Sequence, residues 1–204
     1  HHDNLKSFGA CFGVSGGYES PMWFALDGDK TEYEYSYNYQ NWYPSAEHET
    51  NNTIKNVGLF DLTPFSKFEV KSDKAHLELQ KICTSNIKNE IGKCVYTHML
   101  NTDGGIEADL TVVCIDNNHF RIISSAATRE RDKFHIKKYL SKDVKIKDVT
   151  DDLCVFGLFG PKSRDLIKTI SKDNFDNEDF KFGTAKYVQI DGIKIWTQRL
   201  YYIG

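Results

Sequence analysis

A hairpin near the middle of the sequence brings together three side chains that could exchange protons with a ligand. If Asp103-Gly104 forms a two-residue turn, the numbers of facing residues add up to 207, and His98 lies opposite Asp109. Tyr96 then lies diagonally across from Asp109 on the same face of the hairpin. A carboxylate can accept a proton or stabilise a cation, and an imidazole or a phenol can hydrogen-bond to it. A single bulge would shift this register, and a cross-strand ion pair or an exposed sheet face accounts for the same residues.

Asp109 stands out because of its neighbours. It is followed by Leu110, Val112 and Val113 in a strand-like run. Aspartate is disfavoured within strands, and a buried charge is costly unless a partner compensates for it. We therefore expect some feature of the fold or of a ligand to compensate for the charge at this position.

Other catalytic patterns are weaker. Residues 13–17 match G-x-S-x-G, which places a nucleophilic serine on a strand-to-helix turn, but Pro21 follows and no helix is predicted. We interpret the segment as a flexible loop. The sequence contains neither a G-x-G-x-x-G after a strand nor a G-x-x-x-x-G-K-[ST] motif, and its seven histidines form no H-x-x-H pair. We predict no metal site.

The five cysteines are odd in number and widely spaced, without a C-x-x-C pair. This pattern argues against a disulfide framework and favours a reducing compartment. A net charge of −3 provides no basic surface for nucleic acid, and no apolar run approaches the roughly 18 residues of a membrane span. We expect neither nucleic acid nor a membrane as a partner.

Helices and strands alternate without a regular β-α-β repeat, which predicts an α+β fold with mostly antiparallel sheets and flanking helices. Helices are expected from an N-cap at Ser45 to Gly58, from Ser72 to about Cys83, over residues 128–140, and after Gly160-Pro161. Strands are expected over residues 60–71, 94–101, 106–115, 120–125, 144–149, 153–159, 187–190 and 193–201. Residues 8–45 show little periodicity, apart from tyrosines at alternate positions from 33 to 39 that are compatible with an exposed strand.

Five segments resemble the folate-binding aminomethyltransferase (glycine cleavage T-protein) superfamily, and they occur in that family's order. They are Gly58–Thr63, Met99–Leu110, Ser125–Asp132, Phe159–Pro161 and Arg199–Gly204. Residues 12–25 and 40–44, with Glu47-His48, look like the tetrahydrofolate domain of dimethylglycine and sarcosine dehydrogenases. In those flavoproteins an N-terminal FAD domain oxidises an N-methyl amine, and tetrahydrofolate captures the one-carbon unit as 5,10-methylenetetrahydrofolate. The resemblance thus implies tetrahydrofolate as cofactor, a small amine-derived substrate, and FAD only in a domain absent from this chain.

The resemblance also implies individual roles. Asp109 matches the family's essential aspartate, a buried carboxylate near the transferred carbon, and Tyr96 matches a tyrosine that contacts folate. Phe65 occupies a position that is often methionine and would offer a flat wall. Ser125 stands where the T-protein commonly has an asparagine that contacts the ligand. Tyr202 matches a tyrosine at the pterin end of the cofactor.

Domain organisation follows from the same resemblance. Residues 46–204 are expected to form the folate-binding domain, ending before the family's C-terminal barrel, and residues 1–45 a lead-in whose first two histidines we interpret as a tag remnant. We expect a cytoplasmic protein, or a mitochondrial matrix protein in a eukaryote. Two alternatives remain: a stand-alone folate-dependent methyltransferase or demethylase, and a non-catalytic regulatory relative with the same fold.

Overall fold

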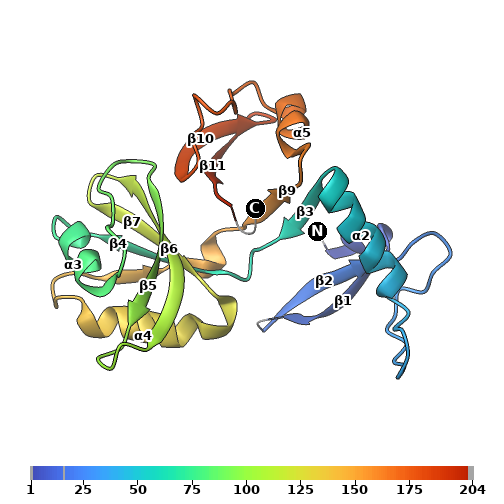
Figure 1. Ribbon diagram of the computed structural model, residues 1–204, viewed down its shortest axis with the longest axis horizontal. Coiled ribbons are helices and arrows are strands. Elements are labelled where there is room, and N and C mark those ends of the chain that lie inside the picture. Colours follow the sequence, from blue (N-terminus) through green and yellow to red (C-terminus); the bar gives the residue numbers. More distant parts are fainter. Residues whose placement is uncertain (1, 16, 202–204) are drawn as a thin grey trace. The chain divides into compact units, whose positions relative to one another are not determined.

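A computed structural model describes residues 2–15 and 17–201 (Figure 1). The chain divides into two compact units, each built from two stretches of sequence. Unit 1 comprises residues 1–64 and 155–166, and unit 2 comprises residues 65–154 and 167–204. Every described strand pairing is antiparallel, so the predicted α+β class is confirmed.

The described elements that lie wholly within unit 1 form two small antiparallel ribbons and two helices. Its elements are α1 (His2–Ser7), β1 (Ala10–Ser15), β2 (Tyr18–Phe24), α2 (Tyr43–Lys55), β3 (Gly58–Asp61) and β9 (Phe156–Phe159). β1 pairs with β2, and β3 pairs with β9. The helix α2 begins earlier than its expected cap at Ser45, because Pro44 lies in the first turn, where its fixed φ and missing N–H are tolerated.

The expectation of an irregular segment over residues 8–45 is partly wrong. Ala10–Ser15 and Tyr18–Phe24 form the paired strands β1 and β2, and Ser15 at the end of β1 pairs with Tyr18. The first three residues of the G-x-S-x-G pattern, Gly13–Ser15, therefore lie in a strand, and another strand follows from Tyr18. Ser15 lies neither in the flexible loop that we predicted nor at a strand-to-helix turn.

The run of tyrosines from 33 to 39 does not form a strand. Two of its backbone N–H groups form hydrogen bonds with side chains instead. Glu34 N–H donates to Asn41 Oδ1 at 2.9 Å, and Ser36 N–H donates to Gln40 Oε1 at 3.2 Å. Local bonds of this kind compete with a sheet ladder. Period-2 spacing of tyrosines was therefore a misleading strand signal.

Unit 2 contains a five-stranded sheet in the order β5-β6-β7-β4-β8, with helices on one face, and a separate β10–β11 ribbon. Its elements are β4 (Ser66–Lys71), α3 (Ala75–Ile82), β5 (Cys94–Leu100), β6 (Ile106–Asp116), β7 (His119–Ser124), η1 (Ala126–Thr128), α4 (Arg129–Tyr139), β8 (Ile146–Asp148), η2 (Thr150–Asp152), β10 (Thr184–Ile190) and β11 (Ile193–Arg199). The helix α5 (Ser163–Ile170) begins in unit 1 and ends in unit 2. α3 starts three residues after Ser72, whose hydroxyl instead accepts a bond from the Lys74 amide at 3.3 Å.

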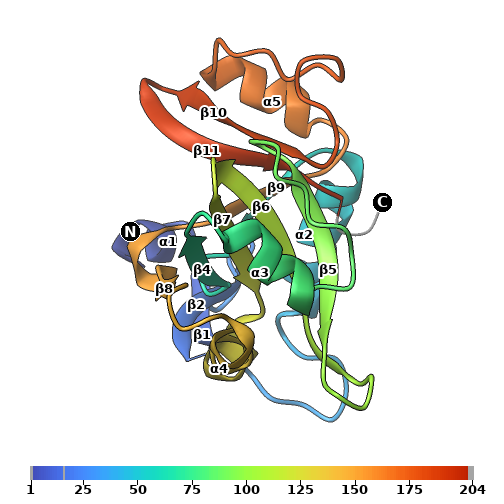
Figure 2. The ribbon, with the colours of Figure 1, turned by 90° about the vertical axis from the view of Figure 1, so that its left-hand side faces the viewer.

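The main core lies between this sheet and the helices α3 and α4 (Figure 2). Alternate residues of β6, namely Ala108, Leu110, Val112 and Cys114, face it together with Leu79 of α3 and Ile136 of α4. Alternation along a strand sends the intervening residues to the opposite face. That opposite face carries the candidate site.

Candidate functional site on the open sheet face

Asp109 lies on the sheet face opposite α3 and α4. Ala108 and Leu110 on either side of it are 4% and 3% exposed, whereas Asp109 itself is exposed. Asp109 is therefore not the buried carboxylate that the family resemblance implied. Strand alternation, rather than a buried counter-ion, compensates for an aspartate among apolar residues.

The predicted register of the hairpin is confirmed, although the predicted turn is wrong. His98 pairs with Asp109, and Tyr96 pairs with Thr111. The strands do not meet at Asp103-Gly104, because Leu100 pairs with Ile106 and leaves five residues in the loop. A bulge between Met99 and Leu100 absorbs the difference and restores the sum of 207 along the rest of β5.

Tyr96, His98 and Asp109 form a contiguous polar cluster, as the register predicted. The Tyr96 hydroxyl donates to Asp109 Oδ2 at 3.1 Å, and His98 Nε2 lies 3.4 Å from the same hydroxyl. The Tyr96 and His98 rings meet edge to face, with centroids 5.2 Å apart. Tyr96 is 60% exposed, so its ring presents a flat surface beside an accessible carboxylate.

Phe65 and Ser125 lie at the ends of the neighbouring strands. Phe65 directly precedes β4, Ser125 directly follows β7, and the paired residues Ser66 and Ser124 align these ends with Leu110 of β6. Ser66 Oγ donates to the Ser125 carbonyl at 2.9 Å, while Ser125 Oγ accepts a bond from the Ala127 amide at 3.3 Å.

Phe65 and Ser125 thus lie at the same end of the sheet's strands as Asp109. Within the described part of the chain, however, no hydrogen bond joins Ser125 to Asp109. Tyr202, the fifth predicted site residue, lies outside the described residues.

Lys67 is a residue of this face that the sequence analysis missed. The register aligns it with Ile123 and Thr111, in the row that ends at Tyr96. It is 1% exposed, and this burial lowers the pKa of its ammonium group. The alternation of Phe68 and Val70 toward the core could have assigned Lys67 to the Asp109 face.

The far end of the same face is closed by the β10–β11 ribbon. The Cys94 amide donates to the Gly183 carbonyl at 2.9 Å, and Cys94 Sγ lies 4.0 Å from Gln198 Oε1 of β11. Val113, paired with Cys94, is fully buried. Burial raises the pKa of the Cys94 thiol to about 12. Within unit 2, the accessible end of this face is therefore the end that carries Asp109 and Tyr96.

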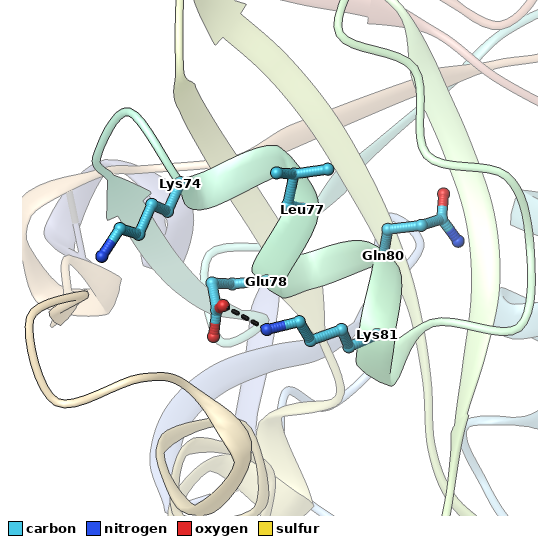
Figure 3. Close-up of a pocket in the computed structure, with 5 residues that line it drawn as sticks. All are labelled: Lys74, Leu77, Glu78, Gln80 and Lys81. Carbon is cyan, nitrogen blue, oxygen red and sulfur yellow. Dashed lines mark hydrogen bonds and ion pairs between the residues drawn. The ribbon is translucent and has the colours of Figure 1, made fainter.

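A shallow hollow of about 470 Å³ lies elsewhere, along α3 (Figure 3). Its lining comes from this helix and its N-cap residue alone: Lys74, Leu77, Glu78, Gln80 and Lys81. Glu78 and Lys81 pair with each other across it. None of the predicted site residues lines this hollow, and one helix cannot surround a ligand.

Among the residues that the structure describes, no group of three or more His, Cys, Asp or Glu side chains is arranged as a metal site would require. Of the described helices, none combines the length and hydropathy of a membrane span.

The fold is that of an aminomethyltransferase of the T-protein type. The crystal structure of the glycine cleavage system aminomethyltransferase T from Bartonella henselae superposes with a TM-score of 0.68 over 90% of this chain and 45% of that chain, at 17% sequence identity. The family described as the GCVT N-terminal domain matches residues 1–204. The chain belongs to this family, which confirms the predicted resemblance.

Curated relatives include two amine-oxidising enzymes. The 4-methylaminobutanoate oxidase (formaldehyde-forming) of Paenarthrobacter nicotinovorans is 32% identical over 204 residues, covering all of this chain and 25% of the relative. The mitochondrial dimethylglycine dehydrogenase of Rattus norvegicus is 30% identical over 195 residues, covering 94% of this chain and 23% of the relative. The chain thus spans about a quarter of the length of these relatives.

Proposed function

We propose that this chain binds tetrahydrofolate and transfers to it a one-carbon unit derived from an N-methyl amine of the dimethylglycine or sarcosine type, giving 5,10-methylenetetrahydrofolate. The observation that carries this proposal is the contact between Tyr96 and Asp109 at the accessible end of the sheet face. An exposed aromatic ring beside a carboxylate fits a ligand that combines a flat heterocycle with basic nitrogens. The amine-oxidising relatives support the choice of donor.

Tetrahydrofolate, when bound, supplies the secondary amines that take up the one-carbon unit. Asp109 would orient an N–H group of the bound cofactor, stabilise positive charge on the adjacent carbon and nitrogen, and accept the proton that this nitrogen loses. The Tyr96 hydroxyl fixes the orientation of this carboxylate through its 3.1 Å hydrogen bond, and its ring offers a stacking surface. Phe65 and Ser125 would extend the contact surface along the strand ends, and Tyr202 would add to it.

The supporting roles of the other parts are also proposals. We assign folate binding to residues 46–204 and treat residues 1–45 as a lead-in, because Phe65, Tyr96, Asp109 and Ser125 all lie within the first range. Oxidation of the amine is assigned to FAD in another domain of the intact protein. Localisation of the protein in the cytoplasm, or in the mitochondrial matrix of a eukaryote, would suit one-carbon chemistry under reducing conditions.

The first test is Asp109→Asn, with Asp103→Asn as the matched control. Asp103 is an exposed carboxylate in the loop of the same hairpin. In the natural full-length product, we expect Asp109→Asn to lower the rate of methylene transfer by about two to four decades, as is usual when a positioned acid or base is lost. Asp103→Asn should leave the rate unchanged. Full transfer activity in Asp109→Asn would refute the assigned role.

Calorimetric titration with tetrahydrofolate separates the alternatives. The proposed site would be supported if the wild-type chain binds tetrahydrofolate and the Tyr96→Phe variant binds it with lower affinity. Binding without any turnover would favour a regulatory relative. Turnover with an N-methyl or sulfonium donor in the absence of flavin chemistry would favour a stand-alone methyltransferase or demethylase.

A further inference from the structure

His98 has a fixed position next to the proposed site. It lies in β5 directly opposite Asp109 and is half-buried. Its main chain is fixed by two hydrogen bonds to one residue: the His98 amide donates to Thr84 Oγ1 at 3.3 Å, and the Thr84 amide donates to the His98 carbonyl at 3.0 Å. The imidazole is therefore presented from a well-anchored strand.

The hydrogen bonds of this cluster determine which ring nitrogen carries a proton. A carboxylate accepts hydrogen bonds, so the single hydroxyl proton of Tyr96 is directed at Asp109 Oδ2, 3.1 Å away. The 3.4 Å contact between His98 Nε2 and the Tyr96 oxygen then requires a proton on Nε2. The bonds run in one direction, from the imidazole to the phenol and from the phenol to the carboxylate.

We propose that His98 is a positioning residue for one-carbon transfer: its Nε2–H donates to the Tyr96 oxygen, which holds the Tyr96 hydroxyl on Asp109. This inference rests on the proposed function of the Asp109 site. Tyr96 is 60% exposed, so the edge-to-face contact with the imidazole restrains a ring that solvent largely surrounds. Loss of the imidazole would free the phenol to rotate away from Asp109 and leave the carboxylate poorly oriented.

Two replacements of His98 separate this role from a merely structural one. His98→Gln keeps an N–H donor on a side chain of similar reach, whereas His98→Leu keeps bulk and removes the donor. We expect kcat/KM for methylene transfer to fall about 3- to 10-fold in His98→Leu, because this variant loses one neutral hydrogen bond. His98→Gln should restore most of this loss. Equal losses in both variants would overturn the proposal.

A double-mutant cycle with Tyr96 tests whether His98 acts through the phenol. In a Tyr96→Phe background there is no hydroxyl for His98 to hold, so His98→Leu should then cause no further loss of kcat/KM. The same fold-change in both backgrounds would show that His98 acts independently of Tyr96, and the proposal would fail. Far-UV circular dichroism of each variant checks that the strands remain intact.

A spectroscopic measurement keeps this inference separate from the proposed function. In protein labelled with ¹³C at the tyrosine ζ-carbon, Tyr96→Phe assigns the Tyr96 signal. We expect that signal to move in His98→Leu and to stay near its wild-type position in His98→Gln. An unchanged signal in His98→Leu would overturn the role of His98, even if tetrahydrofolate binds. A wild-type protein that fails to bind tetrahydrofolate would instead refute the proposed function.

Discussion

Asp148 anchors the start of α4 to the edge of the five-stranded sheet. Arg129 Nε donates to Asp148 Oδ2 at 2.9 Å, and the Thr150 amide donates to Asp148 Oδ1 at 3.0 Å. Burial alone would raise the pKa of this carboxyl, but the bonds from Arg129 and Thr150 outweigh burial and lower the pKa to about 2. The ionised form is therefore favoured in the folded state.

Replacing Asp148 should make the free energy of unfolding depend less on pH in the acidic range. The pKa of Asp148 is below its usual 3.8 when folded, so its contribution is present above about pH 4 and is lost as the pH falls through about 2. We expect Asp148→Asn to lower the free energy of unfolding by about 2 kcal/mol at pH 7. Urea unfolding at pH 7 and pH 2 checks this, and a difference that is equal at both values would contradict it. Asp103→Asn, which replaces an exposed carboxylate in the loop between β5 and β6, serves as the control at pH 7.

Single residues differ in how readily the sequence reveals them. The patch of Tyr96, His98 and Asp109 could be predicted because one hairpin register fixes all three. The exposure of Asp109 could not, because the apolar residues around it are compatible with burial on either face. Lys67 was missed since its burial depends on elements that are distant in sequence, including Thr150, whose hydroxyl accepts a bond from the Lys67 amide at 3.0 Å.

At the scale of elements, the β10–β11 ribbon joins β5 and β6 through Gly92. The Gly92 amide donates to the Cys114 carbonyl at 2.7 Å, and the Ala185 amide donates to the Gly92 carbonyl at 2.6 Å. Gly92 has a φ of +81°, and a Cβ there would stand 2.3 Å from the Ala185 carbonyl oxygen. Only glycine permits this close approach of two backbones.

Gly92→Ala should therefore be much more destabilising than Gly104→Ala. Gly104 has a similar φ of +83° but nothing within 4 Å of its added Cβ. We expect Gly104→Ala to cost about 1–2 kcal/mol, the cost of a left-handed alanine. Gly92→Ala adds a backbone clash and should cost about 3 kcal/mol or more. Chemical denaturation measures both, and similar losses would show that the ribbon can move away from β5 without penalty.

Elements were predicted best where chain neighbours pair. The β5–β6 and β10–β11 hairpins followed from turn residues between strand-like runs, whereas the five-residue loop and its bulge did not. The β1–β2 hairpin was missed because Pro21 and several glycines interrupt the alternation of apolar and polar residues that is typical of strands. The order β5-β6-β7-β4-β8 places β4 beside β7. These strands are nearly fifty residues apart in the sequence, so no local sequence pattern predicts that they pair.

At the scale of the whole molecule, the five cysteines are free and differ in accessibility. Cys154 is exposed, Cys94 is half-buried, and Cys11, Cys83 and Cys114 are buried. Burial raises the pKa of the thiols of Cys83 and Cys94 to about 12, so the reactive thiolate is scarce at neutral pH.

Iodoacetamide at pH 8 should therefore label Cys154 first in the native protein. Labelling of Cys83 and Cys94 should require urea, because unfolding exposes both thiols and removes the desolvation that raises their pKa. Peptide mass spectrometry after timed quenching identifies the modified residues. Cys154→Ser should abolish the fast phase, and rapid modification of Cys83 in the native protein would contradict the buried environment described above.

The chain passes between the two compact units after residues 64, 154 and 166, the last of these within α5. Unit 1 consequently takes its β3 strand from the first stretch of sequence and the partner strand β9 from a stretch nearly a hundred residues later. A single genetic crossover cannot transfer either unit to another gene as an intact piece. Recombination that preserves both units must carry the interleaved segments together, so they would be inherited as one evolutionary module.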